Sequence, residues 1–139
     1  MSTISVALPQ MSSCGTDQEA NLTKGERFCR RAHEMGADIA LFPEMWNIGN
    51  ASIASAQENP GDLWRAPHRW SGMELPDTSE QEEARARWRE WAVGRDDTFI
   101  VRHRALAEEL GMALAVTYLE RWDGAPRNPV SLIDRRGEM

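Results

Sequence analysis

Four residues combine side chains suited to acid–base or nucleophilic chemistry with positions beside apolar segments. Glu44 follows the apolar run at residues 38–42, within the stretch "GADIALFPEMWNIGN". Cys14 follows the first apolar segment of the chain, Glu120 ends a later apolar segment, and Asn128 leads into the last one. A carboxylate can act as general base and general acid, and a cysteine thiolate can attack a carbonyl carbon. These groups can work together only if the fold brings them to one place.

Short apolar runs alternate with segments of helical periodicity, which is the pattern of an α/β fold. The predicted elements are a strand at residues 4–8, a helix that starts with the capping pair Thr16 and Glu19 and ends at Gly36, a strand at 38–42 that is apolar on both faces, a short charged helix from Ser79, a helix at 99–110 that ends at Gly111, a strand at 112–120, and a fourth strand in "PVSLIDRRGE". Residues 45–96 lack a sustained period and are interpreted as an insert in one domain, not a second domain.

The predicted topology gathers the candidate residues at one edge of a sheet. In open α/β sheets, ligands bind beyond the carboxyl ends of the strands. Glu44 lies just past the second strand, Cys14 follows the first strand, and Glu120 ends the third strand at the same edge. The last two strands are close enough in sequence to form an antiparallel pair, so Asn128 begins the fourth strand at that edge too.

Each candidate also has a purely structural explanation. A glutamate after a strand is more often a solvated loop residue or a helix cap, and asparagine favours turns. A cysteine such as Cys14 is more often a small half-buried residue than a nucleophile. A reactive cysteine needs a cationic or helix-N-terminal environment, and the predicted helix start near Thr16 could supply one. Cys29 lies on the apolar face of the first helix, so we expect it in the core.

Composition excludes several classes of protein. The 139 residues are 41% hydrophobic and 27% charged, as in one folded domain. The net charge of −6 argues against a nucleic-acid partner. No apolar run approaches the ~20 residues of a membrane helix. The first residues lack the basic and apolar regions of a signal peptide, so we expect none, and two cysteines predict a cytoplasmic location. The histidines have no metal-ligand spacing and no nucleotide motif occurs, so we expect no metal and no cofactor.

Three blocks of sequence resemble the carbon–nitrogen hydrolase (nitrilase) superfamily. "GADIALFPEMW" resembles the first catalytic motif of that family, in which a strand ends in Phe-Pro-Glu. "ISVALPQM" and "ANLTKGERFCRRAHEMGAD" resemble the β-α-β unit that opens the family fold, with its glutamine at Gln10. "LAEELGMALAVTYLER" and "NPVSLIDRRGE" resemble the next helix and strand pair. The resemblance implies a nitrilase-like α-β-β-α sandwich, present here as β-α-β-insert-α-β-β.

The resemblance also implies a chemistry and a set of site residues. The family hydrolyses non-peptide C–N bonds of small amide, carbamoyl or nitrile compounds through a Glu-Lys-Cys triad and an acyl-enzyme. Glu44 matches the catalytic glutamate, which Phe42 and Trp46 would bury so that its pKa rises. Glu120, Asn128 and Trp46 would bind substrate or orient the triad. Family members usually form homo-oligomers, so a homo-oligomer is expected when the protein is full length.

This chain departs from the family pattern in an important respect. In the family, the lysine follows the strand that corresponds to "VSLID" and the cysteine lies further downstream, whereas Lys24 and Cys14 match neither position. "DRRGEM" stops in a turn where another strand should begin, so we expect an N-terminal portion that is inactive on its own. Thr117 stands where the family often has glycine. The alternative is a non-catalytic α/β domain that binds a ligand or a partner.

Overall fold

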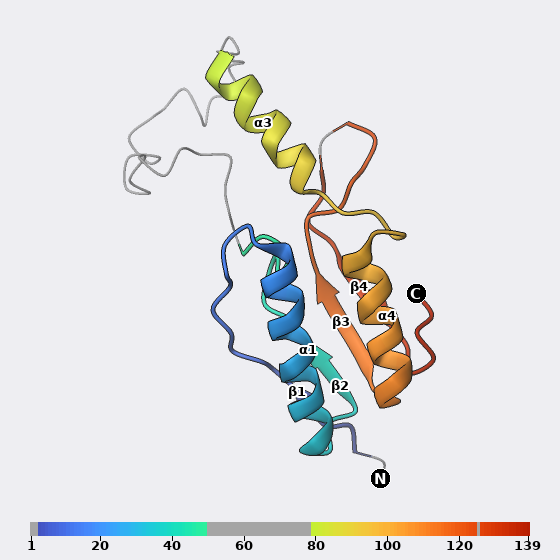
Figure 1. Cartoon of the computed structure of the whole chain (residues 1–139). Coiled ribbons are helices and arrows are strands. Elements are labelled where there is room, and N and C mark those ends of the chain that lie inside the picture. Colours follow the sequence, from blue (N-terminus) through green and yellow to red (C-terminus); the bar gives the residue numbers. More distant parts are fainter. Residues whose placement is uncertain (1–2, 50–78, 125) are drawn as a thin grey trace. The chain divides into compact units, whose positions relative to one another are not determined.

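A computed structural model describes residues 3–49, 79–124 and 126–139 of the chain (Figure 1). The chain forms two compact units, one of residues 1–51 with 91–139 and one of residues 52–90. The first unit contains the sheet and every residue proposed for the site. Most of the predicted insert at 45–96 lies outside the described residues, so the single-domain interpretation stays a prediction.

A four-stranded sheet forms the centre of the first unit. Its strands, in spatial order, are β1 (Val6–Ala7), β2 (Ile39–Leu41), β3 (Ala113–Thr117) and β4 (Val130–Ile133). β1, β2 and β3 are parallel, and β4 pairs antiparallel with β3. The four predicted strands and the antiparallel last pair are therefore confirmed, although the regular part of the first strand is only two residues long.

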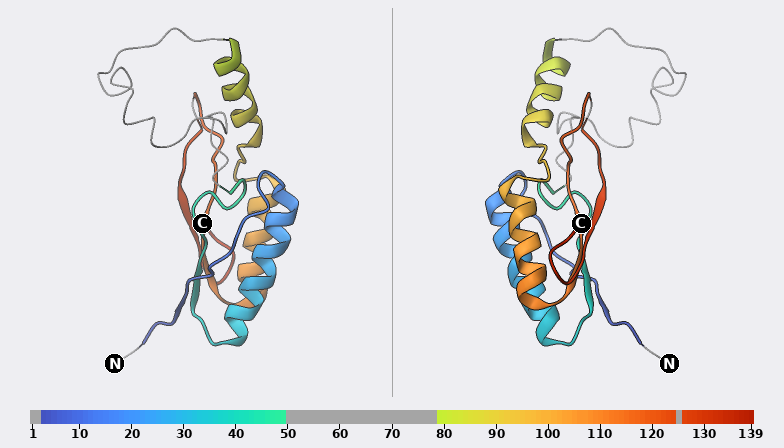
Figure 2. Two further views of the ribbon diagram at one scale, coloured as in Figure 1. Left: turned by 90° about the vertical axis from the view of Figure 1, so that its left-hand side faces the viewer. Right: turned by 90° about the vertical axis from the view of Figure 1, so that its right-hand side faces the viewer.

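Two helices pack on the same face of this sheet (Figure 2). They are α1 (Gln18–Glu34) and α4 (Thr98–Leu110). Gly36 and Gly111 follow them with positive φ angles of 80° and 57°, so both predicted glycine stops are confirmed. A third helix, α3 (Ser79–Trp91), begins at the predicted serine and belongs almost wholly to the other unit.

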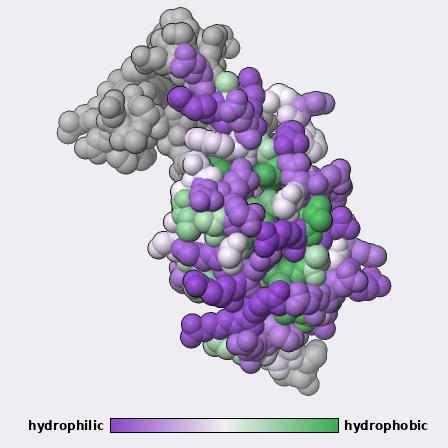
Figure 3. All heavy atoms as spheres, viewed as in Figure 1, coloured by the Kyte–Doolittle hydropathy of each residue, from purple (hydrophilic) through white to green (hydrophobic). Residues whose placement is uncertain are grey.

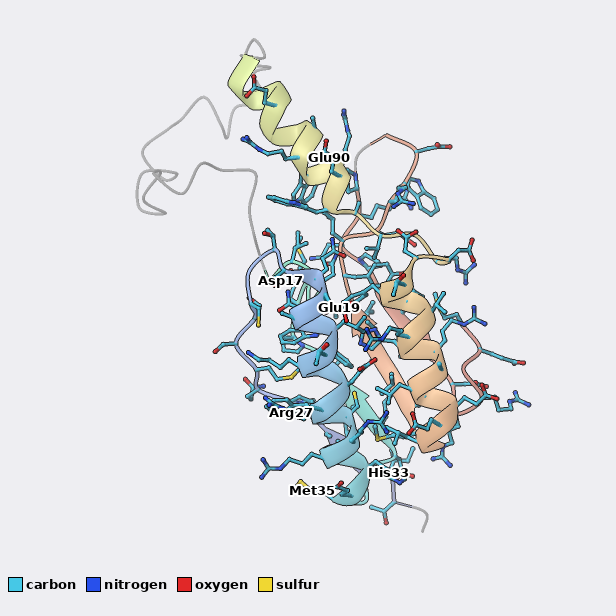
Figure 4. The ribbon with its side chains drawn as sticks, viewed as in Figure 1. Asp17, Glu19, Arg27, His33, Met35 and Glu90 are labelled. Carbon is cyan, nitrogen blue, oxygen red and sulfur yellow. The ribbon has the colours of Figure 1, made fainter. Side chains whose placement is uncertain are left out.

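The predicted cap of α1 is wrong by one residue. Asp17, not Thr16, is the N-cap, and its carboxylate accepts a hydrogen bond from the backbone N–H of Ala20 at 3.0 Å. A carboxylate in this place satisfies a free N–H and also opposes the positive end of the helix dipole. Figure 4 labels Asp17 near the start of α1 and Met35, the C-cap, at its other end.

The core lies between the sheet and the two helices. One row of side chains across the sheet, Ala40, Leu114 and Ile133, is completely buried. α1 packs Leu22 and Cys29 against this layer, and α4 contributes further apolar residues. The outward side of the helices is largely hydrophilic, as Figure 3 shows for the same view as Figure 1.

The other face of the sheet is apolar and exposed in the part of the chain that the structure describes. Val6, Leu41, Val130 and Leu132 are between 39% and 66% exposed, and all four alternate with the buried row. The expectation that residues 38–42 are buried on both faces is therefore wrong for the described chain. The described helices cover only one face of this sheet (Figure 2).

Candidate functional site

A tight turn at residues 42–49 follows β2 and carries Glu44. β2 is an inner strand, because β1 and β3 pair with it on either side. Met45 has a positive φ of 48°, which is uncommon for a non-glycine residue. Its carbonyl accepts hydrogen bonds from the backbone N–H groups of Ile48 and Gly49, at 3.0 and 2.7 Å. The turn places Glu44 beyond the carboxyl end of an inner parallel strand, as predicted.

Asn128 meets Glu44 at this edge. Its side-chain Nδ2 donates a hydrogen bond to Oε1 of Glu44 at 2.7 Å. Asn128 precedes β4, which is antiparallel to β3. The start of β4 therefore lies at the same edge of the sheet as the end of β3. Thr117, the last residue of β3, donates its hydroxyl to the carbonyl of Pro43. The predicted proximity of Glu44 and Asn128 is confirmed, while their catalytic roles stay predictions.

Glu120 lies past the end of β3 at the same edge, but its described contacts are with other residues. Its backbone forms a two-way bridge with Arg127, at 2.7 and 3.0 Å. Tyr118 donates or accepts a hydrogen bond with Ser131 at 2.9 Å between the hydroxyl oxygens. Burial raises the pKa of Tyr118, the bond to Ser131 opposes this rise, and the charge of Glu120 adds to it. The predicted role of Glu120 towards substrate stays a prediction.

Trp46 is part of the core. Its side chain is 1% exposed, packs against Phe42, and donates its indole N–H to the carbonyl of Asn21 at 3.0 Å. Glu44, in contrast, is exposed in this chain. The expectation that Phe42 and Trp46 bury Glu44 is therefore wrong, because both aromatic rings lie in the core with α1. From the core Trp46 helps to hold the turn, and its predicted role towards substrate or the triad stays a prediction.

The cysteines and the lysine occupy different environments. Cys29 is fully buried, and burial raises the pKa of its thiol to about 12, so the predicted core role is confirmed. Cys14 is an exposed free thiol, not the half-buried residue expected. The ammonium of Lys24 donates a hydrogen bond to the carbonyl of Ser12 at 2.8 Å. These contacts give neither Cys14 nor Lys24 a link to Glu44.

Two buried asparagines near the turn were missed in the sequence analysis. Asn21 on α1 and Asn47 in the turn are both 0% exposed. Asn21 bonds the Cys14–Gly15 segment on one side and the carbonyl of Asn47 on the other. The sequence contained a signal for the burial of Asn21, because this residue lies next to Leu22 on the face of α1 that packs towards the sheet.

A glycine lets the turn approach α1 closely. A Cβ at Gly25 would lie 2.7 Å from a ring carbon of Phe42 and 2.9 Å from the indole nitrogen of Trp46. Such distances are far below ordinary contact, so a side chain here would displace the segment that leads to Glu44. A depression on the surface of α1 is lined by residues that include Asp17 and Arg27 (Figure 4). Neither Glu44 nor its hydrogen-bond partner Asn128 lines it.

An exposed carboxylate held by an amide donor can accept and return a proton, which is the work of a general base. Within residues 3–49, 79–124 and 126–139, no three or more His, Cys, Asp or Glu side chains gather where they could hold a metal ion. None of the helices described is long and apolar enough to cross a membrane.

Comparison with solved structures shows the same fold in amidases. An amidase from Nesterenkonia sp. superposes with a TM-score of 0.57 at 22% identity, over 97% of this chain and 40% of that one. A cysteine-to-alanine variant of the Nesterenkonia AN1 amidase, described as a member of the nitrilase superfamily, gives 0.59 at 21% identity over the same shares. A similar variant in complex with butyramide gives 0.57 at 22%, again over 97% and 40%. This chain thus spans about 40% of the length of these amidases.

The sequence comparisons agree with the fold. No protein of curated function matches this chain. The sequence profile of the carbon-nitrogen hydrolases, in contrast, matches residues 5–139, which is nearly the whole chain and includes Glu44 and Asn128. The predicted resemblance and the predicted fold are therefore confirmed, and this chain belongs to the carbon-nitrogen hydrolase family.

Proposed function

We propose that this chain supplies the general base, Glu44, of an enzyme that hydrolyses a non-peptide C–N bond in a small amide, carbamoyl or nitrile compound. The observation that carries the proposal is the position of Glu44. It follows an inner parallel strand, in the family's Phe-Pro-Glu segment, with Asn128 donating to its carboxylate at 2.7 Å. The amidase of the same fold supports an amide as the first substrate to test, since variants of the Nesterenkonia sp. AN1 amidase were solved with butyramide and with acrylamide.

Glu44 would move one proton in each half of the reaction. It accepts the proton of a cysteine thiol, and the thiolate attacks the carbonyl carbon to give a tetrahedral oxyanion. A lysine ammonium can stabilise the charge on that oxygen. When the C–N bond breaks, Glu44 returns the proton to the leaving amine, and an acyl-thioester remains. Glu44 then takes a proton from water, and the hydroxide attacks the thioester; as the C–S bond breaks, Glu44 returns that proton to the sulfur, so the acid is released and the free thiol is regenerated.

Asn128 would orient the carboxylate for these transfers. A donor on Oε1 fixes the carboxylate plane and leaves the other oxygen, Oε2, free to accept the thiol proton. A positioned general base of this kind contributes about 10²–10⁴-fold to a rate. The cysteine and the lysine are assigned to no residue of this chain, and we expect the isolated 139 residues to be inactive because a base alone falls far short of the acceleration that amide hydrolysis needs. We further propose a single domain with an insert at 45–96, a cytoplasmic location and a homo-oligomeric enzyme.

The test uses the native gene product that contains this chain. It is incubated with amide, carbamoyl and nitrile substrates while ammonia release is followed, and the reaction is stopped early for mass spectrometry of the intact protein. Ammonia release together with an acyl adduct on a cysteine supports the proposal. Binding of these compounds without turnover or adduct would instead support the non-catalytic binding domain. Loss of an adduct in Cys14→Ser would make Cys14 the nucleophile and overturn the assignment of roles.

A further inference from the structure

We propose that Asn47 is a positioning residue, which locks the turn carrying Glu44 onto β3 and so holds the carboxylate against Asn128. The inference rests on the proposed function for its catalytic meaning. Asn47 is three residues from Glu44, has a completely buried side chain, and does not contact Glu44 through any hydrogen bond of the described residues. Its effect would therefore pass through the backbone of the turn.

The backbone ladder between β2 and β3 continues into this turn by means of Asn47. The N–H of Phe42 donates to the carbonyl of Ala115 at 3.0 Å, and the N–H of Trp46 donates to that of Thr117 at 3.1 Å. At the next step, the N–H of Leu119 donates at 2.8 Å to the side-chain Oδ1 of Asn47. The amide oxygen thus replaces a backbone carbonyl where the strand itself has ended.

The remaining polar atoms of Asn47 tie the turn to two other segments. Its Nδ2 donates to the carbonyl of Trp91 at 3.1 Å, and its backbone carbonyl accepts from Nδ2 of Asn21 at 3.0 Å. Gln18 of α1 donates to the same carbonyl of Trp91 at 2.8 Å. These bonds are buried or half-buried, so water cannot readily replace them when one partner is removed.

The geometry beside Glu44 explains why the turn needs such restraint. Met45 has a left-handed backbone conformation that a non-glycine residue adopts only when its surroundings enforce it. The ladder bonds of Phe42 and Trp46 fix the chain on both sides of Glu44, and Asn47 fixes the side that follows Met45. Without Asn47, Met45 can return to an ordinary conformation, and the direction of Glu44 changes.

The test reads the Glu44–Asn128 contact directly and needs no turnover. In the full 139-residue chain, the side-chain amide resonance of Asn128 is assigned in an NMR spectrum by its loss in Asn128→Asp. Glu44→Ala then gives the position of this resonance when the hydrogen bond is absent. We expect Asn47→Ala to move the resonance more than half of the way to that position. Asn47→Ser, whose short hydroxyl cannot reach both partners, should act in the same direction and serves if the alanine variant does not fold.

Leu106→Ala is the matched control, because Leu106 is a buried core residue on α4 outside the turn. It should lower stability while leaving the Asn128 resonance near its original position. An unchanged resonance in a folded Asn47 variant, or an equal movement in Leu106→Ala, would overturn the inference. Full turnover of Glu44→Gln in the native gene product, with the resonance still moving in Asn47→Ala, would instead refute the proposed function and leave the structural link intact.

Discussion

His103 should make the stability of the fold depend on pH. It lies on α4 and is completely buried between the rings of Phe42 and Phe99, whose centroids are 5.0 and 4.7 Å from its own. Its Nδ1 lies 2.7 Å from the carbonyl of Phe99, which requires a proton on that nitrogen, while Nε2 has no partner in the described structure. A second proton on Nε2 would place a positive charge in an apolar core.

The size of the effect follows from the pKa of His103. Burial lowers this pKa from 6.5 to about 4, the bond to Phe99 opposes the change, and the nearby charge of Arg102 adds to it. The unfolded chain therefore binds a proton more readily than the folded one, so the free energy of unfolding rises with pH. The contribution is complete above pH 6.5 and is lost as the pH falls to about 4. It amounts to about 3 kcal/mol, at ~1.4 kcal/mol for each pKa unit.

The assay is urea unfolding of the chain at several values between pH 7.5 and pH 4. His103→Leu removes the titrating group and keeps an apolar side chain, so its free energy of unfolding should depend less on pH by about 3 kcal/mol over this interval. His33→Gln, at an exposed position of α1, is the control and should follow the parent chain. A constant difference between parent and His103→Leu at every pH would refute the reasoning, because carboxylates titrate in both.

Three further predictions concern packing and exposure. Gly25→Ala should lower the free energy of unfolding by about 1–3 kcal/mol, because the new methyl group would lie 2.7 Å from a ring carbon of Phe42; chemical denaturation measures it. A thiol reagent should label Cys14 rapidly in the native chain and Cys29 only after unfolding, because burial raises the pKa of Cys29 to about 12; peptide mass spectrometry distinguishes the sites. Leu132→Glu should weaken self-association of the chain, because Leu132 is 66% exposed on the apolar sheet face; sedimentation velocity measures it.

The packing prediction and the self-association prediction each have a matched control. Thr23→Ala changes an exposed residue of the same helix as Gly25 and should leave stability nearly unchanged. For Leu132→Glu the control is Val101→Glu, which adds the same charge at a 46% exposed position on α4. Because α4 packs on the opposite face of the sheet from Leu132, this variant should leave self-association unchanged. Equal effects in control and test variant would contradict the packing argument or the sheet-face argument. Prompt labelling of Cys29 in the folded chain would contradict its burial.

Sequence periodicity was sufficient to predict the sheet and the helices that position Glu44. The apolar run before Pro43 predicted an inner parallel strand, and Gly36 and Gly111 marked helix ends, because these features depend on neighbouring residues. The placement of Asn128 at the same edge as Glu44 followed from topology, since an antiparallel last strand must begin at the edge where parallel strands end, whereas their hydrogen bond was not predicted. The catalytic assignment came from family resemblance, and geometry alone would have left Glu44 as an exposed loop residue.

The missed features depend on side chains that are distant in sequence. Asn47 forms hydrogen bonds with Trp91 and Leu119, which lie 44 and 72 positions further along the chain. No local sequence pattern identifies such distant partners. The predicted burial of Glu44 failed because Phe42 and Trp46 turn towards α1, where Gly25 leaves room for them. His103 could have been placed in the core, because it shares the helical spacing of Phe99, Ile100 and the other buried residues of α4.

The most direct test of the role of Glu44 is the steady-state rate of amide hydrolysis by Glu44→Gln in the native gene product. Glutamine keeps the shape of the side chain and can still bond to Asn128, but it cannot accept the thiol proton. We predict a fall in kcat of at least about 10²-fold, with an unchanged melting temperature. A kcat within a few-fold of the parent enzyme would contradict the assignment of Glu44 as the general base.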